Sequence, residues 1–286
     1  LTVKNDTRFS VKNLRIINAG SGTTEGLVAK SFTAGSNTGP GLWENILIGS
    51  FTTNAHFGDA SDFAVSEQYF VNFESQQATT CFLMEDSTSA YNTTNFNFHG
   101  FYSSNCTTGF KWTGPPGANG PPINVYGGAF SLNGLDFDIE TPAQVFVGHM
   151  HIDSGGYFMR VGPSNPATGT AAEAHVTIES LQTSYAAATG GIVMKLHHAG
   201  MYTIRNTIFN YGGVLQLDGA SGALASLIVE NSTINAATPI AYTGNRSAWN
   251  IRTFNVGTDT AAPSAKIDDL AYQINSHGTE GVYQGA

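Results

Sequence analysis

Three charged residues in the middle of the chain have the side-chain types needed to cleave an acidic sugar polymer. Asp138, Arg160 and Lys195 each lie within a short segment in which apolar residues alternate with polar ones. They fall into one outward column if three core residues are aligned as inward positions, namely Phe137, Met159 and Met194. In β-elimination of a uronic acid, a cation neutralises the sugar carboxylate and a basic side chain removes the C5 proton. The column therefore predicts a lyase site, with a ladder of surface salt bridges as the non-catalytic alternative.

Carboxylates beside this column give two further chemical possibilities. Asp136 and Glu140 occupy the flanking outward positions, and together with Asp138 they could hold Ca²⁺ against a sugar carboxylate. No other cofactor is expected. Asp136 and Asp138 are also two residues apart on one strand, hence roughly 6.5–7 Å apart, which is close to the carboxylate spacing of inverting glycosidases. Solvated surface acids would show the same pattern.

Aromatic side chains are the candidates for sugar binding, since an aromatic ring offers a sugar an apolar platform. We expect four of them in loops, where they could stack on a glycan: Trp43, Tyr91, Tyr102 and Tyr185. Most of the others fit inward stacks of a core, including Phe70, Phe73, Phe98, Phe101, Phe110 and Trp112. His149, His151 and Asp153 share one face of a strand and could bind a metal, or could be ordinary surface residues.

A loose repeat indicates how these residues are positioned. An apolar residue, a variable residue and then a small or amide residue recur along the chain, as in Val11-Lys12-Asn13, Trp43-Glu44-Asn45, Phe70-Val71-Asn72, Phe98-His99-Gly100, Tyr126-Gly127-Gly128 (uncertain by one residue), Phe146-Val147-Gly148, Ile178-Glu179-Ser180, Ile204-Arg205-Asn206, Val229-Glu230-Asn231 and Ile251-Arg252-Thr253. A second short strand follows most of these motifs. Strands separated by Gly-, Ser- and Asn-rich turns suit the coils of a β-helix, in which each coil buries its apolar face against the next.

Two columns support this alignment of the coils. The middle residues of the last four motifs alternate in charge, namely Glu179, Arg205, Glu230 and Arg252. Beside them run Ser180, Asn206, Asn231 and Thr253, and stacked Asn side chains can hydrogen-bond along such a column. We therefore predict an all-β, right-handed parallel β-helix of about ten coils over residues 1–256. Residues 257–286 are expected to form a cap or a link to a further module or partner.

Composition limits the partners. Only 12 % of the 286 residues are charged and the net charge is −9, so the clustered cations that nucleic-acid binding needs are absent from the sequence. No apolar run approaches the roughly 20 residues that cross a bilayer, and we expect no membrane insertion. Cys81 and Cys106 are expected to be two small buried thiols, with a bridge between neighbouring coils as the alternative.

On these repeated motifs, such as Ile204-Arg205-Asn206 and Val229-Glu230-Asn231, the chain resembles the pectate-lyase-like β-helix superfamily over roughly residues 8–256. The low charge and the Asn, Thr, Ser and Gly bias are most similar to bacteriophage tailspike or fibre domains. That resemblance implies an extracellular or virion-surface protein, often a homotrimer, that recognises cell-surface polysaccharide. A lyase or hydrolase acting on an acidic glycan, and a purely structural fibre or capsid element, are the alternatives.

Overall fold

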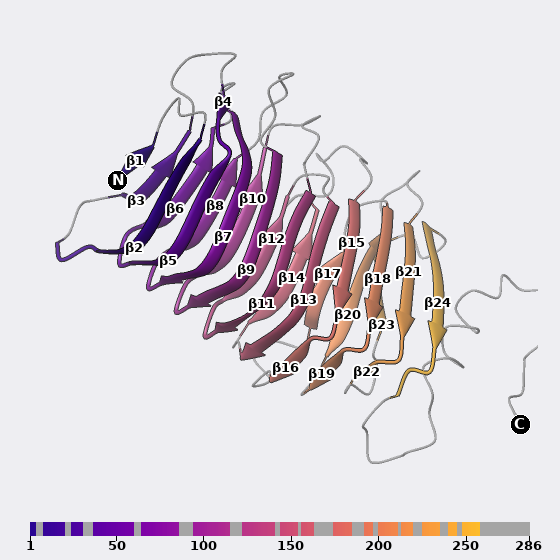
Figure 1. Ribbon diagram of the computed structural model, residues 1–286. Coiled ribbons are helices and arrows are strands. Elements are labelled where there is room, and N and C mark those ends of the chain that lie inside the picture. The colour runs from indigo at the N-terminus through magenta and orange to yellow at the C-terminus, as the bar shows by residue number, and fades with distance from the viewer. Residues whose placement is uncertain are drawn as a thin grey trace, which may run out of the picture.

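The protein is a stack of parallel β-strands. The computed structural model describes residues 1–3, 8–20, 24–30, 37–59, 64–85, 94–114, 122–140, 144–153, 156–162, 174–184, 192–196, 200–210, 213–219, 225–234, 240–244 and 248–257. Over these residues the strands are all paired in parallel, and no α-helix is present. The strands follow one another from the N-terminal to the C-terminal end of the stack (Figure 1). The predicted all-β parallel β-helix is confirmed.

One sheet receives a single strand from each successive coil. In the described part of the chain it has ten strands, in the spatial order β1 (Thr2–Val3), β3 (Glu25–Ala29), β6 (Thr53–Gly58), β8 (Thr80–Glu85), β10 (Thr108–Thr113), β12 (Leu135–Ile139), β14 (Tyr157–Val161), β17 (Ile192–Leu196), β20 (Val214–Gly219) and β23 (Ile240–Gly244). This sheet carries the predicted catalytic column.

The second sheet receives the strands that precede these in each coil. Its main path in the described ranges is β2 (Phe9–Ile17), β5 (Gly41–Gly49), β7 (Ala64–Gln76), β9 (Thr94–Ser104), β11 (Pro122–Ser131), β13 (Gln144–Asp153), β15 (Ala174–Glu179), β18 (Gly200–Arg205), β21 (Ala225–Glu230) and β24 (Trp249–Phe254). Off this path lie β4 (Asn37–Thr38), β16 (Gln182–Ser184), β19 (Ile208–Asn210) and β22 (Thr233–Ile234). In the early coils this part of the chain is one long strand, whereas in the late coils it is two short strands.

The second sheet bends in each coil at a residue with a left-handed backbone. Positive φ angles of 46–82° occur at most of the motif positions found in the sequence, namely Asn13, Asn45, Asn72, Gly100, Ser180, Asn206 and Asn231. Asn and Gly recur there because they adopt this conformation at the lowest steric cost. Their amides also form a ladder: Asn72 donates to Asn45 over 3.1 Å and Asn45 donates to Asn13 over 3.0 Å. Of the predicted column Ser180, Asn206, Asn231 and Thr253, the first three lie at this bend. Asn255 takes the place of Thr253 and donates a 3.0 Å hydrogen bond to Asn231.

Two motif assignments were wrong, and a third is now resolved. The bend falls on His149 and Asn255, not on Gly148 and Thr253, whereas the uncertain motif has its bend at Gly127. Consequently the last step of the charge column is shifted by two residues. Glu179, Arg205 and Glu230 are in register, and Arg205 Nη2 lies 3.0 Å from Glu179 Oε2. Phe254, not Arg252, lies opposite Glu230.

Aromatic rings stacked along the axis fill the core of the early coils. Phe82 lies between Phe57 and Phe110, with ring centroids 4.9 and 5.3 Å away and nearly parallel planes. Phe70 and Phe98 stack in the same way from the second sheet, at 4.3 Å, and Phe70 meets Phe82 edge-on. The six residues predicted to stack inward, Phe70, Phe73, Phe98, Phe101, Phe110 and Trp112, are all fully buried. Packed rings thus fix the register from which outward side chains project.

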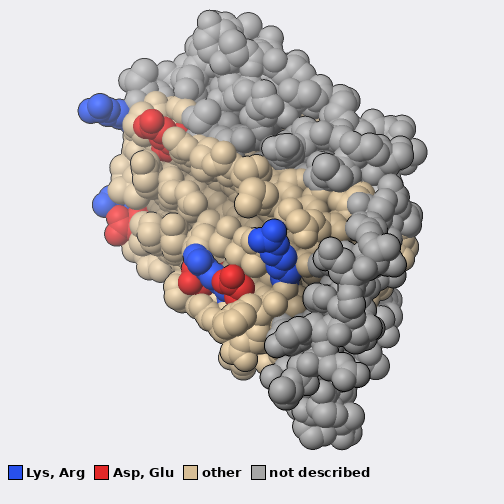
Figure 2. Space-filling view, turned by 90° about the vertical axis from the view of Figure 1, so that its right-hand side faces the viewer, with Lys and Arg blue, Asp and Glu red and all other residues tan. Residues whose placement is uncertain are grey.

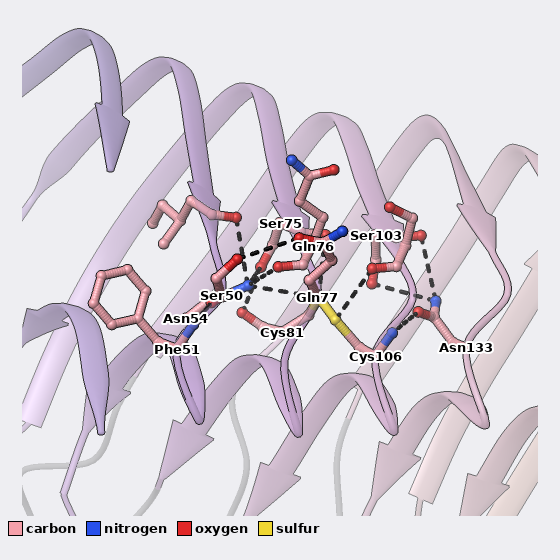
Figure 3. The surroundings of a disulfide bond; sticks show 12 residues. Ser50, Phe51, Asn54, Ser75, Gln76, Gln77, Cys81, Ser103, Cys106 and Asn133 are labelled. Carbon is pink, nitrogen blue, oxygen red and sulfur yellow. Dashed lines mark hydrogen bonds between the residues drawn. A yellow bond between two sulfur atoms is a disulfide. The ribbon is translucent and has the colours of Figure 1, made fainter. Parts of the chain in front are cut away.

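The two cysteines form a disulfide between neighbouring coils, so the expectation of two free thiols was wrong and its alternative holds. Cys81 and Cys106 have Cα atoms 5.9 Å apart and lie 25 residues apart in sequence. Figure 3 shows the bridge at a corner between the two sheets, flanked by Asn54 and Asn133. Asn133 Oδ1 accepts from the Cys106 backbone N–H, and Asn54 Nδ2 donates to the Gln76 carbonyl. The corner therefore combines a covalent link with buried amides that bond the backbone.

The described strands end with β24. Val256 is buried, and Gly257 makes a parallel bridge with Thr233, so the coil pattern reaches the predicted end of the helical domain. Residues 258–286, where a cap or linker was expected, lie outside the described residues.

Candidate functional site

The predicted column of charged residues exists on the outer side of the ten-stranded sheet. Asp138 on β12 pairs in register with Arg160 on β14, which pairs with Lys195 on β17. Arg160 donates two hydrogen bonds to the Asp138 carboxylate, from Nε to Oδ1 at 2.8 Å and from Nη2 to Oδ2 at 2.6 Å. Such a fork-shaped pair is the strongest arrangement of these two groups. The sequence alignment of these three strands is confirmed.

Further charges complete an ion-pair cluster around Asp138. Glu140 Oε1 lies 3.3 Å from Arg160 Nη2 and 3.2 Å from Lys111 Nζ, and Lys111 is in register with Asp138 on the other side. Burial lowers the pKa of Arg160, but hydrogen bonds and attraction to Asp138 and then Glu140 outweigh it, so that its pKa is raised. A base needs the opposite change. The cluster therefore has the character of a salt-bridge ladder, and a catalytic role for Asp138, Arg160 and Lys195 stays a prediction.

Asp136 does not belong to this outward column. It is fully buried, and its Oδ1 accepts a 3.0 Å hydrogen bond from Asn133 Nδ2 at the corner between the sheets. The expectation of an outward Asp136 was wrong because two consecutive residues, Asp136 and Phe137, are both buried where β12 leaves the corner. Asp136, Asp138 and Glu140 do not converge on one point. Within the described ranges no group of three or more His, Cys, Asp or Glu side chains could hold a metal ion.

Lys195 is set apart from the carboxylates of the cluster. Its Nζ lies 4.7 Å from the centroid of the Tyr157 ring, an arrangement in which the ring face attracts the ammonium group. Arg160 stands between Lys195 and Asp138 in the register. The structure therefore brings Asp138, Arg160 and Glu140 into contact and leaves Lys195 beside a tyrosine.

A second charged cluster on the same sheet was not found from the sequence. His56 on β6 is nearly buried, with Nδ1 2.5 Å from Glu25 Oε1 on β3 and Nε2 3.0 Å from Glu85 Oε2 on β8. Burial lowers the pKa of His56, but its hydrogen bonds and attraction to Glu85 and Glu25 outweigh this, and the pKa is raised above 6.5. When protonated, the ring donates to a carboxylate on each neighbouring coil and so links three coils. In the register His56 lies opposite Val28 and Leu83, and the two glutamates reach it from three and two residues away, so neither spacing nor register alone relates these residues.

The four aromatic residues expected to bind sugars lie in different parts of the structure. Trp43 lies on β5, fully buried, and its indole N–H donates a 2.8 Å hydrogen bond to Gln68 Oε1, so its assignment to a loop was wrong. Its motif already carried an inward pattern, which should have placed it in the core. Tyr91 and Tyr185 lie outside the described residues. Tyr102 is 43 % exposed, but on strand β9, not in a loop.

Tyr102 belongs to a larger group on the outer side of the fourteen-stranded sheet, which we call the tyrosine face. It comprises Tyr69, Asn97, His99, Tyr102, Asn124, Tyr126 and Phe146. Three of these, Tyr69, Tyr102 and Tyr126, are 40–45 % exposed and come from the adjacent strands β7, β9 and β11. Among the described residues, no other tyrosine is as exposed as these three. Exposed rings gathered in this way mark interaction surfaces.

The rings and amides of the tyrosine face are ordered by the strand register. Tyr69, Asn97, Asn124 and Phe146 occupy one column on four successive strands. Asn124 Nδ2 donates to Asn97 Oδ1 over 3.0 Å, so an amide pair lies between the two aromatic ends. This column could have been found from the sequence, since Phe70, Phe98, Val125 and Val147 point inward one residue later.

A second column adds stacked rings to the tyrosine face. His99 and Tyr126 stack with centroids 5.4 Å apart and planes 12° apart, and Tyr126 lies 4.9 Å from Phe146. A Cβ atom at Gly148 would lie only 2.7 Å from Phe146 Cε1, so glycine allows the Phe146 ring to lie flat against the strand. The result is a set of rings held by their neighbours before any ligand arrives, which lowers the entropy lost on binding.

Charge is scarce on the surface of the described residues. Figure 2 shows one face of the molecule on which most of the described surface is uncharged and acidic and basic side chains are few. On the outer strands that carry the tyrosine face, β7, β9, β11 and β13, no Lys or Arg occurs. The contacts that these strands can offer a ligand are therefore mainly stacking and hydrogen bonds.

Comparison with known proteins does not place the chain in a family. No protein-family model, curated protein or solved structure matches it.

The described residues include no helix that is long and apolar enough to span a membrane.

Proposed function

We propose that the protein is an extracellular or virion-surface β-helix that recognises a cell-surface polysaccharide through the tyrosine face. The observation that carries this proposal is the column of Tyr69, Asn97, Asn124 and Phe146, with Tyr126 beside it and Tyr102 beyond the bend at Gly100. The C–H face of a sugar ring packs on an aromatic ring, and its hydroxyls pair with amides, so this surface offers both kinds of contact. Tyrosine suits such a role because it combines an apolar ring with a polar tip.

The compartment is supported by the disulfide. Cys81 and Cys106 are the only cysteines of the chain and are bonded to each other. Disulfides persist in secreted proteins and at virion or cell surfaces, and are rare in reducing cytosol. The low charge and the parallel coils fit a tailspike-like or fibre-like protein of the pectate-lyase-like type, which is the finer form of this proposal.

The charged cluster is weaker support for an enzyme. Arg160 already has two carboxylate partners, and Asp138 is almost fully buried beneath it. Binding a uronate through Arg160 would exchange an internal ion pair for the sugar carboxylate. The buried Asp138 carboxylate would then keep only the more distant Lys111, whose Nζ lies 3.9 Å from Oδ2. We therefore assign these residues to the stability of the coils and the tyrosine face to recognition.

A glycan array tests the proposal. The wild-type protein should bind at least one glycan, and the double variant Tyr69→Ala/Tyr126→Ala should bind it at least about tenfold more weakly, since anchoring aromatics contribute more than about 1 kcal/mol each. The matched control is Phe254→Ala, which removes a 68 % exposed ring from β24 at the far end of the same sheet, and its binding should be unchanged.

Three results would contradict the proposal. The first is that no glycan on the array binds the wild-type protein, and the second is that the double variant binds as tightly as the wild type does. Sedimentation velocity supplies the third result: if the double variant loses an oligomeric state that the wild type and Phe254→Ala keep, the tyrosine face is an interface between copies of the chain.

A further inference from the structure

We infer that the ligand of the tyrosine face is an uncharged glycan chain that lies across the strands, parallel to the axis of the stack. The inference rests on the proposed function and narrows it to a ligand class and an orientation. Neither follows from the fold alone, because a β-helix has several outer faces, and a ligand can lie either along a strand or across the strands.

The orientation follows from the direction in which the contacts repeat. Tyr69, Asn97, Asn124 and Phe146 lie at equivalent positions on β7, β9, β11 and β13, so the column crosses four strands. With strands about 4.8 Å apart, the column is about 14 Å long. A linear chain along it meets an aromatic ring or an amide on every strand. A chain laid along one strand would meet only alternate residues, and on β11 these are Asn124 and Tyr126.

The absence of cations from these strands indicates the ligand's charge. Carboxylates and sulfates of acidic glycans are held by Arg or Lys in proteins, because these give charge-assisted hydrogen bonds. The strands β7, β9, β11 and β13 contain neither residue, and Glu74 on β7 lies opposite Tyr102 in the register. The chain as a whole carries a net charge of −9. An acidic polymer would therefore be repelled and would find no partner for its charges.

The amide pair at the centre of the column matches hydroxyl groups. The hydrogen bond from Asn124 to Asn97 uses one donor of Asn124 and one acceptor site of Asn97. Among the described residues, the Asn97 amide NH₂ group and the Asn124 carbonyl have no other side-chain partner. One end of the pair therefore offers a donor and the other an acceptor. A sugar hydroxyl both donates and accepts, whereas a carboxylate only accepts, so the pair complements a neutral sugar more fully.

Biolayer interferometry on immobilised polymers tests the ligand class at pH 7.5. Dextran, galactan and glucomannan represent neutral chains, and polygalacturonate and alginate represent acidic ones. We expect binding to at least one neutral polymer, at least tenfold tighter than to either acidic polymer. That affinity should stay within about twofold up to about 1 M salt, where the screening length is only ~3 Å.

Two variants test the orientation. Tyr69→Ala and Phe146→Ala remove rings at opposite ends of the column, and each should weaken binding of the long chain. The binding of an oligosaccharide too short to span the column should be weakened by no more than one of these two substitutions. Phe254→Ala should leave every affinity unchanged, and circular dichroism should show that all variants remain folded.

The outcomes separate this inference from the proposed function. Tightest binding to an acidic polymer, with affinity that falls steeply with salt, would overturn the uncharged ligand while leaving glycan recognition in place. Equal sensitivity of a short oligosaccharide to both end variants would overturn the orientation. Binding to no polymer of either class would overturn the proposed function itself.

Discussion

Removing the disulfide should destabilise the protein by an amount set by the loop that it closes. Cys81 and Cys106 are 25 residues apart, which is one coil of the stack. The chain-entropy relation for a loop of this length gives about 3.5 kcal/mol at 25 °C. The variant Cys81→Ala/Cys106→Ala should therefore lose about 3.5 kcal/mol, plus a smaller loss of packing because both cysteines are buried.

Urea unfolding at equilibrium measures this loss. Circular dichroism follows the whole sheet, and tryptophan fluorescence follows Trp43 and Trp112 in early coils and Trp249 in the last described coil, all of them buried. Coincident curves from the two probes show whether the stack unfolds as one unit, which stacked coils need not do. The single variant Cys106→Ala is the control, because it breaks the bridge while keeping the Cys81 side chain.

The size of the loss in unfolding free energy tests the loop-closure argument. If entropy of the unfolded chain is the cause, the single and double variants should be destabilised similarly, with the bridge accounting for most of the loss. A double variant within about 1 kcal/mol of the oxidised wild-type protein would refute the loop-closure argument. Near-complete recovery of stability in the double variant relative to the single one would point instead to a penalty from an unpaired buried thiol.

Three further changes test the clusters and the core. The pKa of His56 is raised in the folded protein, so its stabilising contribution is fully present below pH 6.5 and is lost as pH rises through the raised value; the Tm deficit of His56→Gln should be larger at about pH 5.5 than at about pH 9. Asp138→Asn should cost about 2–3 kcal/mol in urea unfolding, less than for a fully buried pair because the Arg160 side chain is 27 % exposed. Phe82→Ala should cost about 3–5 kcal/mol by the same method, because its ring is fully buried between two others.

Each of these has its own contrary result. An equal Tm deficit at both pH values would show that the charge of His56 contributes nothing. For the ion pair, the double variant Asp138→Asn/Arg160→Gln should recover part of the lost stability, and a double variant that adds the two single losses would show no coupling between them. A loss below about 1 kcal/mol for Phe82→Ala would mean that the aromatic column does not hold the early coils together.

Alternation of apolar and polar residues was sufficient to predict the middle of each strand. Phe137, Met159 and Met194 are large buried side chains that face one core, so aligning them placed Asp138, Arg160 and Lys195 correctly. A shift of one residue would have moved every core side chain to the outside, which is why strands with one buried face have a well-defined register.

Alternation fails where the chain turns a corner between the sheets. At the start of β12, Asp136 and Phe137 are both buried, and the same is true of Asn54 and Ala55 on β6. Period-two reasoning therefore placed Asp136 outside. In each case the side chain that breaks the pattern bonds the corner: Asn54 accepts from the Phe51 backbone N–H. Buried amides and acids at strand starts are thus a signal for corners that hydropathy alone does not give.

Contacts between side chains of different coils, separated by loops of unequal length, could not be predicted from the sequence. His56 lies 31 residues after Glu25 and 29 before Glu85, spacings that resemble many others in the chain. The tyrosine face was closer to prediction, since one-residue errors in the motif alignment at Tyr126 and at Phe146 were what obscured its columns. The column of the tyrosine face follows from knowing which residues of successive coils lie directly opposite. The His56 cluster needs the side-chain positions as well, because His56 lies opposite Val28 and Leu83.

The parallel stacking has a consequence for how the chain reaches its fold. Phe110 pairs with Phe82, 28 residues earlier, and with Phe137, 27 residues later. Divided by 286 residues, such a separation gives a relative contact order of about 0.1, in the range of helical bundles and below the ~0.16–0.22 of most all-β folds. Each coil therefore finds its template in the coil made immediately before it. A chain still emerging from the ribosome can add strands to the stack one coil at a time, without waiting for its C-terminal half.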